Sequence, residues 1–290
     1  MKKHIFPDVP PPYSGTSFVK LKEGIFDAPE IDVFITETGD FACLSPMPIM
    51  NYENYQPRAE TLSLKSYRAS TGVYDLRYEK IREYLQPGIA MLEIGAGDAD
   101  FLAYIHNQKP DLDLTCVEPD DNTKAHRDRH SWLHHAQSTD ELQANTYDIV
   151  SCFHVLEHII EPTDFLSVCA NLLKLNGKVI IEVPSLTDPL LSLYAIPEYE
   201  NFYFQKQHPY YYSPTSLQHL LEHNGFTVEA MIPHQRYGLE NHLAWLTQGK
   251  PGGNENYRRI FANSCAAYRA SLETAGHADT VIAIATFNPA

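Results

Sequence analysis

Short apolar runs alternate with helical patterns along much of the chain, and this alternation constrains the fold more than any other feature. Six runs are predicted as strands, at residues 89–94, 113–118, 147–153, 178–183, 226–232 and 280–287. Most of these runs are apolar throughout, whereas a strand with one solvated face would alternate apolar and polar residues. Strands that are apolar throughout are typical of a parallel sheet buried on both faces. Strands that alternate with helices form such a sheet, with helices on both faces. The sequence therefore predicts a doubly wound α/β fold.

The intervening segments predict helices and a simple domain division. Helical patterns cover residues 59–85, 99–107, 124–133, 163–173 and 254–275, and a further helix begins at Ser213-Pro214. Residues 1–60 are rich in proline, with one predicted strand at 31–36, and are expected to form an N-terminal arm or cap. Residues 61–290 form one domain with a helical insertion at about 239–278.

Composition and charge narrow the partners. The 290 residues hold 22 Lys and Arg against 37 Asp and Glu, a net charge of −15, and the basic residues form no run. Nucleic-acid binding, which uses basic stripes, is therefore not expected. The sequence contains no apolar run of about 18 residues, so no membrane span is expected. The five cysteines form no C-x-x-C pair, and no apolar leader follows Lys2 and Lys3, so the protein is predicted to be cytoplasmic. Because nucleic acid is not expected as a partner, the predicted substrate is a small molecule.

The first strand of the alternating region runs into a glycine turn. Glu93 lies in the strand, and Gly95 and Gly97 follow it. Glycines allow a tight turn and close approach of backbone to a ligand, and ligands of such sheets bind outside the carboxyl ends of the strands. A G-x-G pattern alone is a weak signal.

Nearby acids identify the kind of ligand. Asp98 and Asp100 follow the glycines, where they would repel a pyrophosphate. Glu118 ends the second strand, at the distance from the turn at which a carboxylate reaches the ribose hydroxyls of a nucleoside. A cationic nucleoside without phosphates fits these features, and S-adenosylmethionine (SAM) is such a molecule.

These motifs resemble those of the class I SAM-dependent methyltransferases. The likeness comprises the acid and glycines of residues 93–99, the acid at Glu118, and the fourth-strand segment 147–158. It implies a mainly parallel, seven-stranded Rossmann-like sheet with an antiparallel last strand. It also implies SAM contacts from Glu93, Gly95, Ala96, Gly97, Glu118, Pro119, Asp120, Phe153 and His154.

The same segment contains His154, Glu157 and His158. Some ubiquinone-pathway O-methyltransferases place a metal near such a motif. The alternative is that these residues open a helix, with Glu157 in its first turn. No metal is predicted.

On the acceptor side, His208 is the candidate general base. Residues 205–214 resemble a segment of deoxysugar C-methyltransferases in which a histidine is the base, but Gln205 replaces their tyrosine and their cysteine-rich zinc module is absent. Alternatively, His208 hydrogen-bonds to backbone at a helix entry.

Four further residues are candidate substrate contacts: Tyr203, Tyr211, Arg236 and His242. The aromatic cluster around them could stack on a ring, or form a lid or a homodimer contact. Tyr52, Tyr55 and Arg58 of the arm could cover the same pocket.

The predicted function is SAM-dependent methylation of a small molecule. The preferred acceptor is a hydroxyl group of a nucleotide sugar or glycan precursor. The alternatives are O-methylation of an aromatic or quinone-like metabolite, and SAM binding without catalysis. A nicotinamide-dependent oxidoreductase is disfavoured by Asp98 and Asp100.

Overall fold

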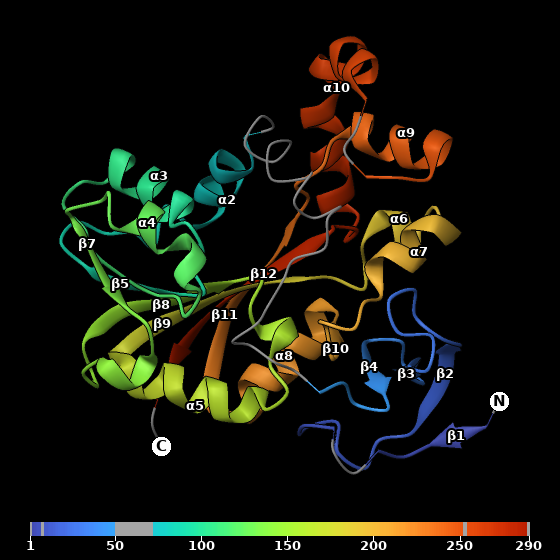
Figure 1. Ribbon diagram of the computed structural model, residues 1–290, viewed down its shortest axis with the longest axis horizontal. Helices are drawn as coiled ribbons and strands as arrows, with labels where there is room; N and C mark the ends of the chain where they lie inside the picture. The colour runs from blue at the N-terminus through green and yellow to red at the C-terminus, as the bar shows by residue number, and fades with distance from the viewer. Residues whose placement is uncertain (1, 7–8, 50–71, 252–253, 289–290) are drawn as a thin grey trace.

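The protein contains two β-sheets, and its computed structural model describes residues 2–6, 9–49, 72–251 and 254–288 (Figure 1). The larger sheet has seven strands, in the order β11 (Phe226–His234), β12 (Thr280–Phe287), β9 (Leu173–Pro184), β8 (Tyr147–Phe153), β5 (Ala90–Ile94), β6 (Asp113–Val117) and β7 (Leu133–Ala136). The arm residues Tyr52, Tyr55 and Arg58 and the first part of the helix predicted over 59–85 lie outside the described residues.

Strand directions in this sheet confirm the predicted fold class. The pairs from β9 through β8, β5 and β6 to β7 are parallel. β12 is antiparallel to both of its neighbours, β9 and β11. The sheet is therefore the mainly parallel, seven-stranded Rossmann-like sheet with an antiparallel last strand. The carboxyl ends of β5, β6, β8 and β9 share one edge, which is where ligands of such sheets bind.

Helices cover both faces of the sheet (Figure 1). One face carries α2 (Val73–Ile81), α3 (Asp100–Gln108) and α4 (Lys124–Arg127), and the other carries α5 (Pro162–Leu172) and α8 (Pro214–His223). α8 begins as predicted, because the Ser213 side chain accepts a hydrogen bond from the Ser216 N–H and Pro214 occupies the first turn.

Alternate side chains of the strands fill two cores. On β12, Val281 and Ala283 belong to the core that includes Leu166 of α5, whereas Ile282 belongs to the core that includes Leu102 of α3. Successive side chains of a strand point to opposite faces, so a strand buried on both faces is apolar throughout. This explains why the sheet could be predicted from the sequence.

The helix predicted over 124–133 is shorter than expected. α4 ends at Arg127, and Leu133 begins β7, which pairs in parallel with β6 through Leu114–Leu133 and Val117–Ala136. The sequence of β7, Leu-His-His-Ala, carries no strand pattern. It becomes a strand because the open edge of β6 offers its backbone groups a ladder of hydrogen bonds.

The smaller sheet is antiparallel. It has the order β1 (Lys3–His4), β2 (Phe18–Lys22), β3 (Asp32–Thr36), β4 (Phe41–Ser45) and β10 (Tyr210–Tyr212). β3 lies within the strand predicted at 31–36. The fifth strand, β10, comes from the segment that follows β9, so the N-terminal segment and the main domain share this sheet.

β10 fixes the chain just before it. The Leu44 N–H donates to the Pro209 carbonyl at 3.0 Å. The Tyr211 hydroxyl accepts from the Gln205 N–H at 2.8 Å and lies 3.1 Å from the Gln205 carbonyl, to which it donates. The smaller sheet therefore holds the loop that contains His208.

The remaining helices lie in two places: α6 (Pro189–Ser192) and α7 (Pro197–Tyr203) follow β9, and α9 (Leu239–Gln248) and α10 (Glu255–Thr274) form the segment between β11 and β12 where the helical insertion is predicted. Turns of 3₁₀ helix lie at Asp121–Thr123, Thr139–Glu141 and Leu156–His158. In the part of the chain that the structure describes, none of the helices combines the length and apolarity needed to cross a bilayer.

Phe41→Ala tests the core that the two sheets share, because Phe41 belongs to the same cluster of buried side chains as Leu92 and Val150 of the large sheet. Phe41 is fully buried in β4 and its ring packs on Tyr13 and Tyr210 at centroid distances of 4.2 and 5.7 Å. We expect the free energy of unfolding to fall by about 3–5 kcal/mol because a large core side chain is removed. Urea unfolding followed by circular dichroism measures it.

Phe26→Ala is the matched control, because Phe26 is 74% exposed and its loss should change the free energy of unfolding by less than about 0.5 kcal/mol. Equal effects of the two substitutions would contradict a shared core between the sheets.

Candidate functional site

The glycine turn after β5 is packed against the end of β8. Gly95 has a φ of +75° and Gly97 a φ of +56°, with Ala96 between them. A Cβ on Gly95 would lie 2.5 Å from Cγ2 of Val155. Both the left-handed backbone and this close approach require glycine at position 95.

Glu118 lies beside this turn, as the sequence predicted. Its carboxylate accepts hydrogen bonds from the N–H groups of Gly97 at 2.8 Å and Asp120 at 2.9 Å. A carboxylate can accept about four hydrogen bonds, so these two leave capacity for two ligand hydroxyls. Pro119 is exposed next to it, and Asp120 caps the turn Asp121–Thr123.

Glu93 is buried behind the glycine turn. Burial raises the pKa of its carboxyl to about 8, and the nearby Arg77 only partly opposes this shift. Its Oε2 atom has no hydrogen-bond partner among the described residues. A buried carboxyl oxygen without a partner, next to the glycine turn, can form a hydrogen bond to a ligand that binds there.

His154 occupies the end of β8 in a left-handed conformation, with a φ of +61°. Its Nε2 atom lies 2.6 Å from Nη1 of Arg236, and its Nδ1 atom lies 3.2 Å from Oε1 of Glu157. A guanidinium only donates, so Nε2 accepts and Nδ1 carries the proton donated to Glu157. The neighbouring Phe153 ring packs against Phe101 and the Arg77 guanidinium.

Arg236 is held in turn by Asp279. Its backbone N–H and its Nε atom each lie 2.7 Å from one carboxylate oxygen of Asp279. Burial alone would lower the pKa of Arg236, but Asp279 outweighs burial and raises it. Asp279, Arg236, His154 and Glu157 thus form a continuous polar chain along the edge of the sheet.

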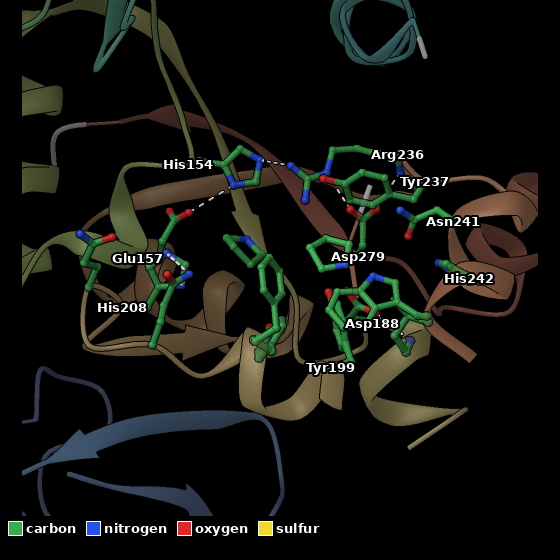
Figure 2. A pocket seen from close by; sticks show the side chains of 18 of the residues that line it. His154, Glu157, Asp188, Tyr199, His208, Arg236, Tyr237, Asn241, His242 and Asp279 are labelled. Carbon is green, nitrogen blue, oxygen red and sulfur yellow. Dashed lines mark hydrogen bonds and ion pairs between the residues drawn. The ribbon is translucent and has the colours of Figure 1, made fainter. Parts of the chain in front are cut away.

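A cavity of about 180 Å³ lies beside this chain (Figure 2). Figure 2 shows His154, Glu157 and His208 at one end and Asp188, Tyr199 and His242 at the other. Its walls consist of His154, Glu157, His158, Pro184, Asp188, Leu190, Tyr199, Phe202, Tyr203, Gln205, Gln207, His208, Arg236, Tyr237, Asn241, His242, Trp245, Pro251 and Asp279.

Three of the four predicted substrate contacts line the cavity. Tyr203 is buried, and its hydroxyl has no partner among the described residues. Burial lowers the pKa of His242 to about 4, so its imidazole is neutral, and its Nδ1 lies 2.6 Å from the Tyr268 hydroxyl. Arg236 is the third. Tyr211 lies outside the wall, because its hydroxyl is engaged by the backbone of Gln205.

His208 lies at the end of the cavity next to His158, with their rings 4.6 Å apart. Ligand-type atoms of Glu157, His158 and His208 lie within 4.8 Å of one another, so these side chains could hold a divalent ion. A histidine nitrogen that binds a metal cannot accept a proton at the same time. A metal ligand and a general base are therefore competing roles for His208.

Several wall residues were missed in the sequence. Asp188 accepts from the Leu190 N–H at 2.8 Å and from the Tyr199 hydroxyl at 2.5 Å, and burial together with the adjacent Asp279 raises its pKa. Asn241 and Trp245 come from α9. For Asp279 the available signal was an acid directly before a buried strand, and for Asp188 an acid directly before a proline that opens a helix. Neither signal says which acids meet.

Comparison with known proteins gives matches over the domain and over short segments. The profile of a family described as a methyltransferase domain matches residues 67–231, more than half of the chain. Ubiquinone biosynthesis O-methyltransferases of Photobacterium profundum and Xanthomonas axonopodis pv. citri are 43% identical over 47 residues and 35% identical over 63 residues. These segments are 16% and 21% of this chain, and 20% and 26% of the relatives.

Solved structures share the fold. A SAM-dependent methyltransferase from Archaeoglobus fulgidus superposes with a TM-score of 0.53 at 19% identity, over 79% of this chain and all of that one. The phosphoethanolamine N-methyltransferase 2 of Haemonchus contortus, solved with SAM bound, has a TM-score of 0.52 at 13% identity, over 86% of this chain and 62% of that one.

Glu93→Gln tests the buried carboxyl. A group whose folded pKa of about 8 exceeds the unfolded value of 4.5 holds its proton longer in the folded state, so stability falls as pH rises between these values. Each pKa unit corresponds to about 1.4 kcal/mol. We expect Glu93→Gln to gain stability relative to the native protein between pH 5 and pH 8, measured by urea unfolding without ligand.

The exposed Glu83→Gln is the control and should keep a constant difference from the native protein over this range. A constant difference for Glu93→Gln as well would show that Glu93 ionises normally in the folded protein.

Proposed function

The chain belongs to the methyltransferase family, and from this premise we propose that it methylates a hydroxyl group on a small ring-shaped acceptor. The predicted methyltransferase family is confirmed, because the methyltransferase-domain profile covers residues 67–231. Solved SAM-dependent methyltransferases share the fold, which supports S-adenosylmethionine as the methyl donor. The acceptor and the roles of individual residues are the substance of the proposal.

SAM is assigned to the edge of the sheet between the glycine turn and Glu118. The Glu118 carboxylate accepts from the ribose hydroxyls, while Pro119 and Asp120 lie under the adenine. Gly95, Ala96 and Gly97 bring backbone close to the ligand. Glu93, and the backbone at Phe153 and His154, face the methionine end. His154 also lines the cavity, which supports placing the methyl group at the end of the cavity near Glu157 and His208.

The walls of the cavity favour an aromatic or quinone-like acceptor over a nucleotide sugar. Tyr199, Phe202 and Trp245 provide ring faces, with Tyr199 and Phe202 5.0 and 5.3 Å from Trp245 between ring centroids. Planar rings stack on such walls. This aromatic wall, in the same cavity as the proposed methyl position but toward its opposite end, is the observation that carries the proposal.

The charges of the cavity lead to the same acceptor class. Arg236 is the single Arg or Lys among the described lining residues, and Asp279 already neutralises it. Glu157 and Asp188 add acidic groups to the walls. A diphosphate would therefore meet no unpaired Arg or Lys side chain here, whereas a neutral hydroxylated ring fits.

The resemblance to deoxysugar methyltransferases and the homodimer stay predictions.

The reaction needs positioning and one proton acceptor. The acceptor oxygen attacks the methyl carbon in line with the sulfur, the carbon–sulfur bond breaks with its electron pair going to sulfur, and S-adenosylhomocysteine leaves. His208 takes the hydroxyl proton. The Tyr203 hydroxyl, which has no partner in the described part of the chain, can donate to a second oxygen of the acceptor.

His208→Gln tests the base. With a catechol as acceptor, we expect kcat to fall by about 10²–10⁴-fold, because the proton acceptor is lost, while the Kd of S-adenosylhomocysteine stays unchanged. Turnover is measured with radiolabelled SAM in the presence of EDTA, in parallel with nucleotide sugars as alternative acceptors.

His223→Gln, on the exposed face of α8, is the control and should be fully active. Unchanged turnover in His208→Gln would remove His208 from the mechanism. Loss of native activity in EDTA, restored by a divalent ion, would make His208 a metal ligand instead. Turnover with nucleotide sugars alone would overturn the acceptor class, and no turnover with any acceptor would favour SAM binding without catalysis.

Glu118→Ala tests the cofactor site. Thermal unfolding of the native protein should shift upward with S-adenosylhomocysteine and SAM but not with NADH, since a ligand at a hundred times its Kd adds about 2.7 kcal/mol. Glu118→Ala should lose this shift, because the ribose hydroxyls lose their acceptor. A shift with NADH, or an undiminished shift in Glu118→Ala, would place the cofactor differently.

A further inference from the structure

Arg127, at the end of α4, is buried beneath the two loops assigned to SAM. Only 1% of its surface is exposed, and it makes no ion pair with any acid in the described ranges. A buried guanidinium without an ion-pair partner is costly unless its N–H groups are satisfied. Its two Nη groups donate to neighbouring oxygens instead, whereas its Nε–H has no partner among the described residues.

These oxygens belong to both cofactor loops. Nη1 donates to the Gly97 carbonyl at 2.8 Å and also contacts the Thr123 hydroxyl. Nη2 lies 3.1 Å from the Asp120 carbonyl and 3.4 Å from the Glu118 carbonyl. One planar group therefore cross-links the glycine turn after β5 to the acidic loop after β6.

Gly97 is fixed from both sides by this arrangement. Its N–H donates to the Glu118 carboxylate at 2.8 Å, and its carbonyl accepts from Arg127. Both peptide groups that flank Gly97 are thereby oriented in the left-handed conformation that the turn requires. The same contacts hold the Glu118 carboxylate beside the turn, where the ribose hydroxyls are proposed to bind.

We propose that Arg127 is a positioning residue that sets the affinity for SAM from behind the binding surface, by holding the glycine turn and the Glu118 loop in their ligand-bound arrangement. The inference rests on the proposed cofactor site. Loops held in place before binding lose less conformational freedom when the ligand arrives. Arg127 touches neither the cavity wall nor His208, so the chemical step should not depend on it.

The guanidinium is specifically required because its donors form a rigid fork. A lysine ammonium is a point charge on a flexible stem and cannot satisfy carbonyls on two loops in the same way. Arg127→Lys keeps the charge and loses the cross-link, whereas Arg127→Met keeps most of the aliphatic stem and loses both.

The test measures cofactor affinity apart from turnover in the full-length protein. In Arg127→Met we expect the Kd of S-adenosylhomocysteine and the KM for SAM to rise together, by about tenfold (1.4 kcal/mol) or more, with kcat at saturating SAM and the acceptor KM unchanged. Arg127→Lys should give an intermediate rise, and it provides the measurement if Arg127→Met does not fold. The exposed Arg129→Met is the matched control and should leave both constants unchanged.

Hydrogen exchange separates positioning from a general structural role. Amides of residues 95–98 and 118–121 should exchange faster in Arg127→Lys without ligand and return to native rates with saturating S-adenosylhomocysteine. A lower melting temperature with an unchanged Kd would overturn the proposal while Glu118→Ala still identified the cofactor site. If neither Arg127→Lys nor Glu118→Ala changed the Kd, the proposed cofactor site would fall as well.

Discussion

A fully buried carboxylate, Glu182 on β9, connects the elements that form the site. Its side chain pairs with Nε of Arg77 at 2.6 Å, accepts from the Thr280 hydroxyl at 3.0 Å and lies 3.2 Å from Nδ1 of His234. Burial alone would raise the pKa of Glu182, but Arg77 and His234 outweigh it and keep the pKa well below its usual range. One charge thus joins α2, β9, β11 and β12.

The site depends on this connection. The Glu182 carbonyl accepts from the His154 N–H at 2.8 Å, which ties the end of β8 to the same strand. Arg77 is sandwiched against Phe101 and Phe153, with its guanidinium carbon 5.0 and 4.5 Å from the two ring centres. A buried ion pair held by several hydrogen bonds is rigid, even though Nε2 of His234 has no partner among the described residues. Removing one partner would leave an uncompensated charge. Rigidity here keeps His154 at the boundary between the cofactor edge and the cavity.

The two halves of the site have different structural origins. The proposed cofactor half lies at the carboxyl ends of the neighbouring strands β8, β5 and β6, so the loops that follow them bring its residues together. The proposed acceptor half is assembled from the loop held by the N-terminal sheet, the short helices after β9 and the helical segment α9–α10. Such additions can change the acceptor pocket while the cofactor edge keeps its geometry.

The sequence by itself determined six of the seven strands of the large sheet, the glycine turn and the acid at Glu118. These features follow from local periodicity and from fixed spacing along the chain. It also placed His208, Arg236, Tyr203 and His242 near one another in the chain. The edge strand β7 could not be predicted, because its own sequence has no strand pattern and backbone pairing with β6 makes it a strand. β10 has only three residues, and its partner β4 lies in the N-terminal segment, so its pairing could not be predicted either.

Only the tertiary structure decided which polar groups meet. Arg236 pairs with Asp279, 43 residues away, and Arg127 of α4 supports Gly97, 30 residues away. Tyr211 turned out to hold the loop of His208 from outside the cavity wall. A local pattern records which face of an element is apolar. It carries no information about which buried charge finds which partner, because that depends on how separate elements pack in three dimensions.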